Sequence, residues 1–181
     1  MPAVPYPALD PLKLRVLPLS ARRNLLHLAD ETAQAAAAPP PNDPAVEDKI
    51  AQLAEKMLAA RHRQAAIMFT YGAHLIKNGA GPLLNRLIES RLATHLATQG
   101  AGIIHDWEFA FQGHSGESVR ENAPAGVFGA WDETGRYLNL AALVGAAEGL
   151  GLGEAVGRMI DEDRLVLPSI EALRDAVSAD P

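Results

Sequence analysis

The chain contains no cysteine among its 181 residues. Disulfide bonds, thiol catalysis and cysteine-rich zinc sites are therefore excluded. Long apolar runs are missing as well, since none approaches the roughly 18 residues that a membrane-spanning helix requires. Met1 to Pro11 carries four prolines and lacks the apolar core of a signal peptide. The simplest expectation is a cytoplasmic protein.

Basic residues are in the minority. Lys and Arg number 16 against 22 Asp and Glu, which gives a formal net charge of -6. Because phosphate backbones require a clustered basic face, a nucleic-acid binder is not expected. An acidic surface would suit a cationic polyamine, but mild acidity is common and carries little weight. The hydrophobic share of 48% is ordinary for a globular chain with a sizeable core.

Two short apolar runs each end at glycine. Ala65 to Thr70 and Leu92 to Thr98 are too short for typical helices and suit strands covered on both faces. Gly72 follows the first run, and the triplet Gly100-Ala101-Gly102 follows the second. In open parallel sheets, ligands collect beyond the carboxyl ends of the strands, facing backbone amides and helix N-termini. The stretch from Gly72 to Asp106 therefore predicts half of a nucleotide-binding sheet.

Helix signals dominate the rest of the chain. Ser20 to Ala38 predicts a helix that stops at three prolines, and Asp43 is a good N-cap with Pro44 at the first helical position. The helix after Asp43 carries one apolar stripe, formed by Val46, Ile50, Leu53, Met57 and Leu58. Further helices are expected from Pro82, from the glycine triplet, over Glu117 to Asn122, from Asp132 or Thr134 to about Leu150, over Leu152 to Ile160, and from a cap at Ser169.

The expected fold class is α/β, with a Rossmann-like parallel sheet flanked by many helices. Residues 1–41 are assigned to a proline-rich arm and helix, and residues 42–181 to a nucleotide-binding-like domain. Lys13 to Leu19 is expected to be an edge strand or an irregular arm. Two parallel strands do not make a stable sheet alone. The missing strands come from a downstream segment, from a partner chain, or from Lys13 to Leu17 and Arg164 to Leu167, so the chain is expected to be an incomplete half of a larger fold.

The helix after the glycine triplet is predicted to pack through Ile103, Ile104, Trp107 and Phe111, which leaves Asp106 and Glu108 off the packed stripe. His74 and His105 each follow a strand end and are expected to meet there; ligand contact and hydrogen bonding within the turns are weighted evenly for this pair. His95 is interpreted as a strand residue with satisfied hydrogen bonds. No histidine pair has the spacing of a zinc-protease site, and no metal is expected.

Two segments carry a family resemblance. Tyr71-Gly72-Ala73-His74-Leu75-Ile76-Lys77-Asn78-Gly79 and Thr98-Gln99-Gly100-Ala101-Gly102-Ile103-Ile104-His105-Asp106 resemble the amino-terminal nucleotide-binding half of the deoxyhypusine synthase family. The closest likeness is to the bacterial synthase-like branch. The resemblance extends over roughly Phe69 to Asn139.

The resemblance implies a Rossmann-like sheet, NAD as cofactor, and transfer of the aminobutyl group of spermidine. Where eukaryotic members have Glu-Glu-Asp after the second turn, this chain has Ile104-His105-Asp106, so only the aspartate is kept. The implied cofactor contacts are Ala73, His74 and Lys77 in the first turn, Gln99, Gly100, Ala101 and Gly102 in the second, and then His105 and Asp106.

No catalytic residue is assigned, because the family's catalytic lysine lies in the carboxyl-terminal half, which nothing after Leu150 resembles. Lys77 corresponds to a cofactor turn, and a lone lysine near a helix start is usually solvated. The resemblance implies an NAD-dependent transferase of an aminobutyl group from a polyamine, present here as its amino-terminal part. The alternatives are a non-catalytic nucleotide-binding or assembly module, and a likeness of fold alone. A homo-oligomer, dimer or tetramer, or a second chain that supplies the missing half is expected.

Overall fold

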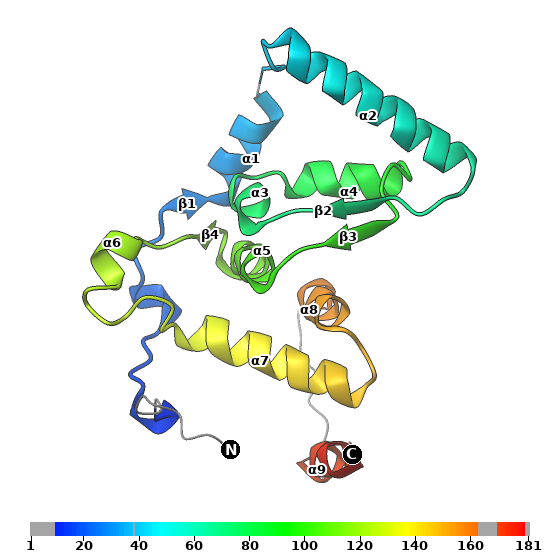
Figure 1. The fold of residues 1–181 in the computed structure, drawn as a ribbon. Coiled ribbons are helices and arrows are strands. Elements are labelled where there is room, and N and C mark those ends of the chain that lie inside the picture. Colours follow the sequence, from blue (N-terminus) through cyan, green and yellow to red (C-terminus); the bar gives the residue numbers. More distant parts are fainter. Residues whose placement is uncertain (1–9, 38, 163–169, 180–181) are drawn as a thin grey trace, which may run out of the picture.

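The computed structural model describes residues 10–37, 39–162 and 170–179, and helices make up most of them (Figure 1). The helices are α1 (Leu28–Ala37), α2 (Pro44–His62), α3 (Ala73–Lys77), α4 (Gly81–Glu89), α5 (Gly100–Gln112), α6 (Val119–Asn122), α7 (Asp132–Ala147), α8 (Leu152–Asp161) and α9 (Ile170–Ala179). The strands are β1 (Leu26–His27), β2 (Met68–Thr70), β3 (His95–Ala97) and β4 (His114–Ser115). Two 3-10 turns, Pro11–Lys13 and Leu19–Ala21, precede them.

Strands β2 and β3 pair in parallel, with Phe69 opposite Leu96, which confirms the predicted parallel pairing. Both strands are shorter than the apolar runs that contain them. Phe69 packs against the cluster formed by Ile76, Leu84 and Phe109, whereas Met68 and Leu96 remain 66% and 40% exposed. The expectation that both faces of the sheet would be covered is therefore wrong for the chain as described. Met68 lies on the face opposite to Phe69, whereas Leu96, the register partner of Phe69, shares its face, so exposed apolar side chains are present on both faces of the pair.

Strands β1 and β4 form a second, antiparallel pair, in which Leu26 lies opposite Ser115. This pairing was not predicted, and it explains why α1 begins at Leu28 rather than at Ser20. Lys13 to Leu19 forms no strand in the described chain beyond one bridge from Leu17 to Trp131. The predicted contribution of Arg164 to Leu167 and the predicted cap at Ser169 lie outside the described residues.

Helix α5 is the central element of the fold, lying between the layer of β2, β3, α3 and α4 and the layer of α7 and α8 (Figure 1). Phe109 belongs to the cluster on the strand side. Trp107 belongs to a larger cluster on the other side, whose buried members are Leu19, Trp107, Trp131, Ala141, Val156 and Met159. The predicted packing of Phe111 is wrong in part, since this side chain stacks on Trp107 but stays 52% exposed.

Helix α2 has its predicted N-terminus, because the Asp43 side chain accepts a hydrogen bond from Ala45 N at 2.9 Å and Pro44 is the first helical residue. The apolar stripe has the predicted helical spacing, yet no residue of α2 is buried. Ile50 and Leu53 are 50% and 55% exposed. A 19-residue helix thus projects from the body with its apolar side uncovered (Figure 1).

No single helix in the described ranges is long and apolar enough to cross a membrane.

Gly79 fixes the contact between α1 and the turn that joins α3 to α4. Its φ is +78°, and a Cβ there would lie 2.3 Å from the Glu31 carbonyl group. Gly149 has a similar φ of +71° but no atom within 4 Å of the same position. We expect Gly149→Ala to cost about 1–2 kcal/mol, the penalty of a left-handed alanine. Gly79→Ala is expected to cost about 1–3 kcal/mol more, because backbone must move.

Urea unfolding of the two variants, followed by circular dichroism, measures the difference. Equal losses of unfolding free energy would contradict the close approach of α1 to Gly79.

Candidate functional site

The two glycine-bounded turns meet at the carboxyl edge of the β2–β3 pair. Tyr71 N donates to Ala97 O at 3.0 Å, and a Cβ on Gly72 would lie 3.9 Å from Gln99 Nε2. A Cβ on Gly102 would lie 2.5 Å from Thr98 Oγ1, so the first turn of α5 packs onto the end of β3 only because this residue is glycine. The parallel pairing of β2 and β3 thus brings the two turns side by side.

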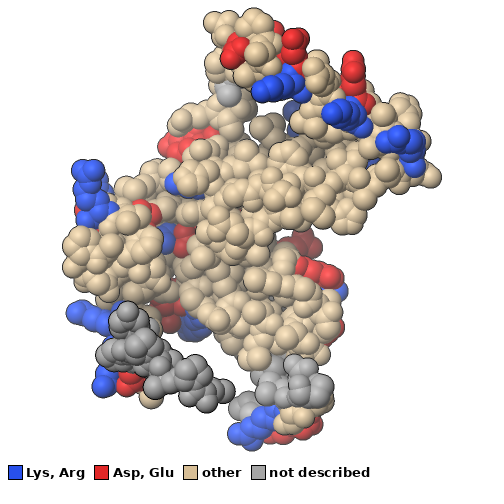
Figure 2. Space-filling model, in the orientation of Figure 1, with Lys and Arg blue, Asp and Glu red and all other residues tan. Residues whose placement is uncertain are grey.

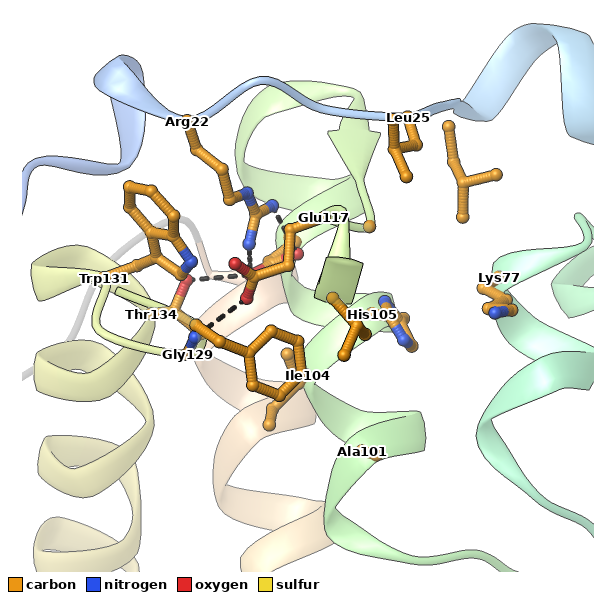
Figure 3. A pocket seen from close by; sticks show the side chains of 15 residues that line it. Arg22, Leu25, Lys77, Ala101, Ile104, His105, Glu117, Gly129, Trp131 and Thr134 are labelled. Atoms are coloured by element: carbon orange, nitrogen blue, oxygen red, sulfur yellow. Dashed lines mark hydrogen bonds and ion pairs between the residues drawn. The ribbon is translucent and has the colours of Figure 1, made fainter. Parts of the chain in front are cut away.

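A cavity of about 460 Å³ lies beside this edge, between α5, the segment around Arg22 and the region that follows β4 (Figure 3). Its walls are mainly apolar, with Leu25, Leu26, Ile104, Val119, Phe128 and Trp131 among them. Arg22, Lys77, His105, Glu108, Glu117 and Thr134 add polar groups. Ala101, Ile104 and His105 come from α5, and Lys77 comes from the end of α3.

Of the nine predicted contact residues, Lys77, Ala101 and His105 line this cavity. The other six lie at the strand edge and are not among the residues that form its walls. Ala73 is only 7% exposed. Loss of hydration raises the pKa of Asp106, and burial followed by the Asp106 charge raises the pKa of Tyr71. Asp106 therefore lies on the side of α5 that faces the strand edge.

The polar wall of the cavity is built around one carboxylate. Arg22 Nη1 and Nη2 donate to Glu108 Oε1 and Oε2, both at 2.7 Å. Ser115 Oγ donates to Oε2 at 2.6 Å, and Thr134 Oγ1 donates to Oε1 at 2.9 Å. Burial raises the pKa of Glu108, but the hydrogen bonds from Arg22, Ser115 and Thr134, together with the Arg22 charge, outweigh it and hold the pKa below its ordinary value. Glu108 is therefore ionised at neutral pH.

The prediction that Glu108 lies off the packed face of α5 is wrong, since the residue is only 1% exposed. The helical pattern marks an apolar stripe, but it contains no sign of a partner 86 residues away in the chain. Arg22, Ser115, Thr134 and Trp131 were missed for the same reason. No local motif identifies them; the one available signal was a carboxylate flanked by Trp107 and Phe109 in an apolar helix.

His105 lies between the ion pair and the cavity. Its Nδ1 is 2.7 Å from Ser115 Oγ. Burial lowers the pKa of His105; the Glu108 charge opposes this, and the charges of Lys77, Arg22 and His74 act with the burial. The charge of His74 therefore acts on His105, but no hydrogen bond or ring contact joins the two described side chains, and their meeting at the strand ends stays a prediction. His95, by contrast, is exposed and bonds through Nδ1 to Thr94 Oγ1 at 2.8 Å.

Among the described residues, no three His, Asp or Glu side chains are grouped as a metal site would require.

The chain matches no protein-family model, and neither the curated proteins nor the solved structures include a match.

Removal of the Glu108 charge is expected to lower the free energy of unfolding. Glu108→Gln leaves the Arg22 guanidinium buried without its counter-ion, and breaking one side of a buried pair costs about 3–5 kcal/mol. Glu121→Gln is the matched control, because Glu121 pairs with Arg23 at 3.5 Å on the surface. An exposed pair contributes at most about 1 kcal/mol. Denaturant unfolding at pH 7 compares the variants, and similar losses for both would show that the buried pair is not what holds these segments together.

The stabilisation by Glu108 is expected to depend on pH. Because its folded-state pKa lies below the ordinary 4.5, the contribution is complete above that value and is lost as the pH falls through the folded-state pKa. The difference in unfolding free energy between the wild type and Glu108→Gln should therefore shrink in acid. A difference that stays constant from pH 7 into the acid range would contradict this assignment.

Proposed function

We propose that this chain is a deoxyhypusine synthase-like protein whose strand edge binds NAD. It would form the amino-terminal part of a transferase that moves an aminobutyl group from a polyamine such as spermidine. One observation carries the proposal: the two turns that bear the family resemblance lie side by side at the carboxyl edge of a parallel strand pair. A Rossmann-like sheet and a cytoplasmic location are parts of the same proposal.

The residues at this edge fit an anionic cofactor. Gly100 opens α5, and no atom lies within 4 Å of the position that a Cβ would take there. Gln99, the N-cap residue, makes no side-chain capping bond, and its carbonyl accepts from Gly102 N at 2.9 Å, so its side chain leaves the amides of Gly100 and Ala101 unoccupied. A pyrophosphate would accept hydrogen bonds from such amides, favoured by the helix dipole. Asp106, on the next turn, would accept from a ribose hydroxyl, or pair with a cationic amine.

NAD would supply a hydride acceptor for oxidation of the amine. The chain's own contribution is to hold and orient the cofactor through Ala73, His74, Lys77, Gln99 and the glycine turn. We assign no lysine to imine formation, because Lys77 is placed with the cofactor contacts.

A non-catalytic binding module is the second candidate, and the state of Glu108 favours it. This is the most buried carboxylate beside the cavity, and it already accepts four hydrogen bonds from Arg22, Ser115 and Thr134. An ionised carboxylate has about four acceptor sites. Glu108 therefore has no capacity left for substrate.

Calorimetric titration with NAD tests the proposal. We expect saturable binding to the wild-type chain and its loss in Gly100→Val, because the new side chain occupies the space before the first amides of α5. Asp106→Ala should weaken binding, since the ribose contact is removed. Gly153→Val is the matched control: Gly153 is in the first turn of α8, and its Cβ position is equally open.

Unfolding curves of both valine variants separate loss of the site from loss of the fold. Absence of binding to a folded wild-type chain, or equal affinity in Gly100→Val and the wild type, would contradict the placement of NAD at this edge.

We also propose that the protein is a homo-oligomer in which a second copy covers α2. Val46, Ile50, Leu53, Met57 and Ala60 repeat at alternating spacings of four and three, the pattern of a helix that packs along a partner helix. The start of α2 is acidic, with Glu47 and Asp48, and its end is basic, with Arg61 and Arg63. An antiparallel pair would bring opposite charges together. Figure 2 shows charged side chains gathered on α2 and at the rim, with a largely uncharged middle.

Leu53→Glu should therefore convert the oligomer into monomers, because it places a charge in the middle of the uncovered stripe. Leu58→Glu is the control: Leu58 was counted in the predicted stripe and is exposed on α2, but it directly follows Met57 and so does not share the alternating spacing of four and three. Light scattering at micromolar concentration gives the mass of each variant. A monomeric wild type, or dissociation by both substitutions alike, would contradict the proposed role of this stripe.

A further inference from the structure

A chain of hydrogen bonds leads from the buried ion pair to the cavity, and the chemistry of its members gives it one direction. The Glu108 carboxylate is ionised and can only accept. Ser115 is fully buried, and its hydroxyl, which has a single proton, donates that proton to Glu108 Oε2 at 2.6 Å. The Ser115 oxygen therefore has only lone pairs to offer His105 Nδ1, 2.7 Å away. The proton between these two atoms must belong to His105.

We propose that Glu108 and Ser115 hold His105 as its Nδ1–H tautomer, so that Nε2 meets a ligand in the cavity as a bare acceptor. The ligand group at this point is then a hydrogen-bond donor, a hydroxyl or an amine. This role is distinct from the contact with NAD at the strand edge, and it does not depend on NAD binding, because the tautomer is a property of the unliganded chain.

The surroundings of His105 keep the ring neutral as well as oriented. Burial opposes protonation, as do the charges of Lys77 and His74 from α3 and of Arg22 from the amino-terminal segment. Only Glu108, on α5 itself, favours the cation, and its charge is shared with Arg22. A neutral imidazole with Nδ1 already donating has an accepting Nε2. The ring can therefore take up a hydrogen bond, or a proton, from a bound group.

Another wall of the same cavity contains a hydrogen-bond donor that has no partner among the described residues. Trp131 lines the cavity and is 6% exposed, and its buried Nε1–H has no hydrogen-bond partner among the described residues. Buried donors are rarely left unpaired. Figure 3 shows Trp131 beside Arg22 and Thr134, whereas His105 lies on the side of Lys77. The cavity thus fits a small molecule with an apolar body that brings a donor for His105, whereas the Trp131 N–H is enclosed by the surrounding protein.

The tautomer can be read directly by nitrogen-15 NMR of the histidine rings, with the His105 signals identified by their absence in His105→Gln. At pH 7 we expect His105 to show a protonated Nδ1 and an unprotonated Nε2. Ser115→Ala removes the acceptor for Nδ1–H and should shift the ring towards the Nε2–H tautomer. Thr134→Val removes a different hydrogen bond to Glu108 and should leave the tautomer unchanged, which separates this effect from general destabilisation.

An Nε2–H tautomer in the wild type would overturn the proposal, and this result needs no variant to fold. An unchanged tautomer in folded Ser115→Ala would overturn the part assigned to Ser115. Diethyl pyrocarbonate, which acylates an unprotonated imidazole nitrogen, probes access from the cavity. Peptide mass spectrometry should find the label on His105, and His105→Gln should lose it. No label on His105 in the folded wild type would show that Nε2 does not face open space.

Discussion

The bidentate ion pair between Arg22 and Glu108 is the interaction on which the arrangement around the cavity depends. Each of these charges would cost several kcal/mol to bury alone, so a chain that places Glu108 inside must also bring Arg22 to it. Ser115 and Thr134 bind the same carboxylate. The amino-terminal segment, α5, β4 and the start of α7 are thereby fixed around one side chain, although they are far apart in the sequence.

The same pair also decides which side chains can act on a ligand. Glu108 is saturated as an acceptor, and Arg22 uses three of its five N–H donors on Glu108 and Asn24. Glu108 therefore has no lone pair left to take a proton from a ligand, and the Arg22 guanidinium stays protonated, despite their position in the cavity wall. They act on a ligand indirectly. Ser115 links Glu108 to His105, and this link sets the orientation and the tautomer of the histidine. The buried ion pair thus has a structural role, in which it holds His105 in a fixed position in the cavity wall.

Sequence patterns predicted those parts of the fold that are decided locally. The N-cap at Asp43, the parallel strands that end before Gly72 and Gln99, and the start of α5 all depend on residues adjacent in the chain. What sequence did not reveal depends on distant partners: the β1–β4 pair, the burial of Glu108 and the position of Arg22. For the site, three of the residues named from the sequence, Lys77, Ala101 and His105, line the cavity, whereas the network that orients His105 was not predicted.

The two sides of α5 differ in how completely their apolar side chains are buried. On the side of α7 and α8, six buried residues close a core around Trp107. On the strand side the buried apolar residues are Ile76, Leu84 and Phe109 with the small side chains of Ala73, Ala80 and Ala93, while Met68, Leu96 and most of the stripe of α2 stay exposed. Exposed apolar side chains that are grouped in this way are typical of interaction faces. The proposed cofactor edge belongs to this less buried side. On the two proposals made above, affinity for a nucleotide and assembly of the protein would therefore be coupled, because a second copy that covers this side would also order the edge that holds the cofactor.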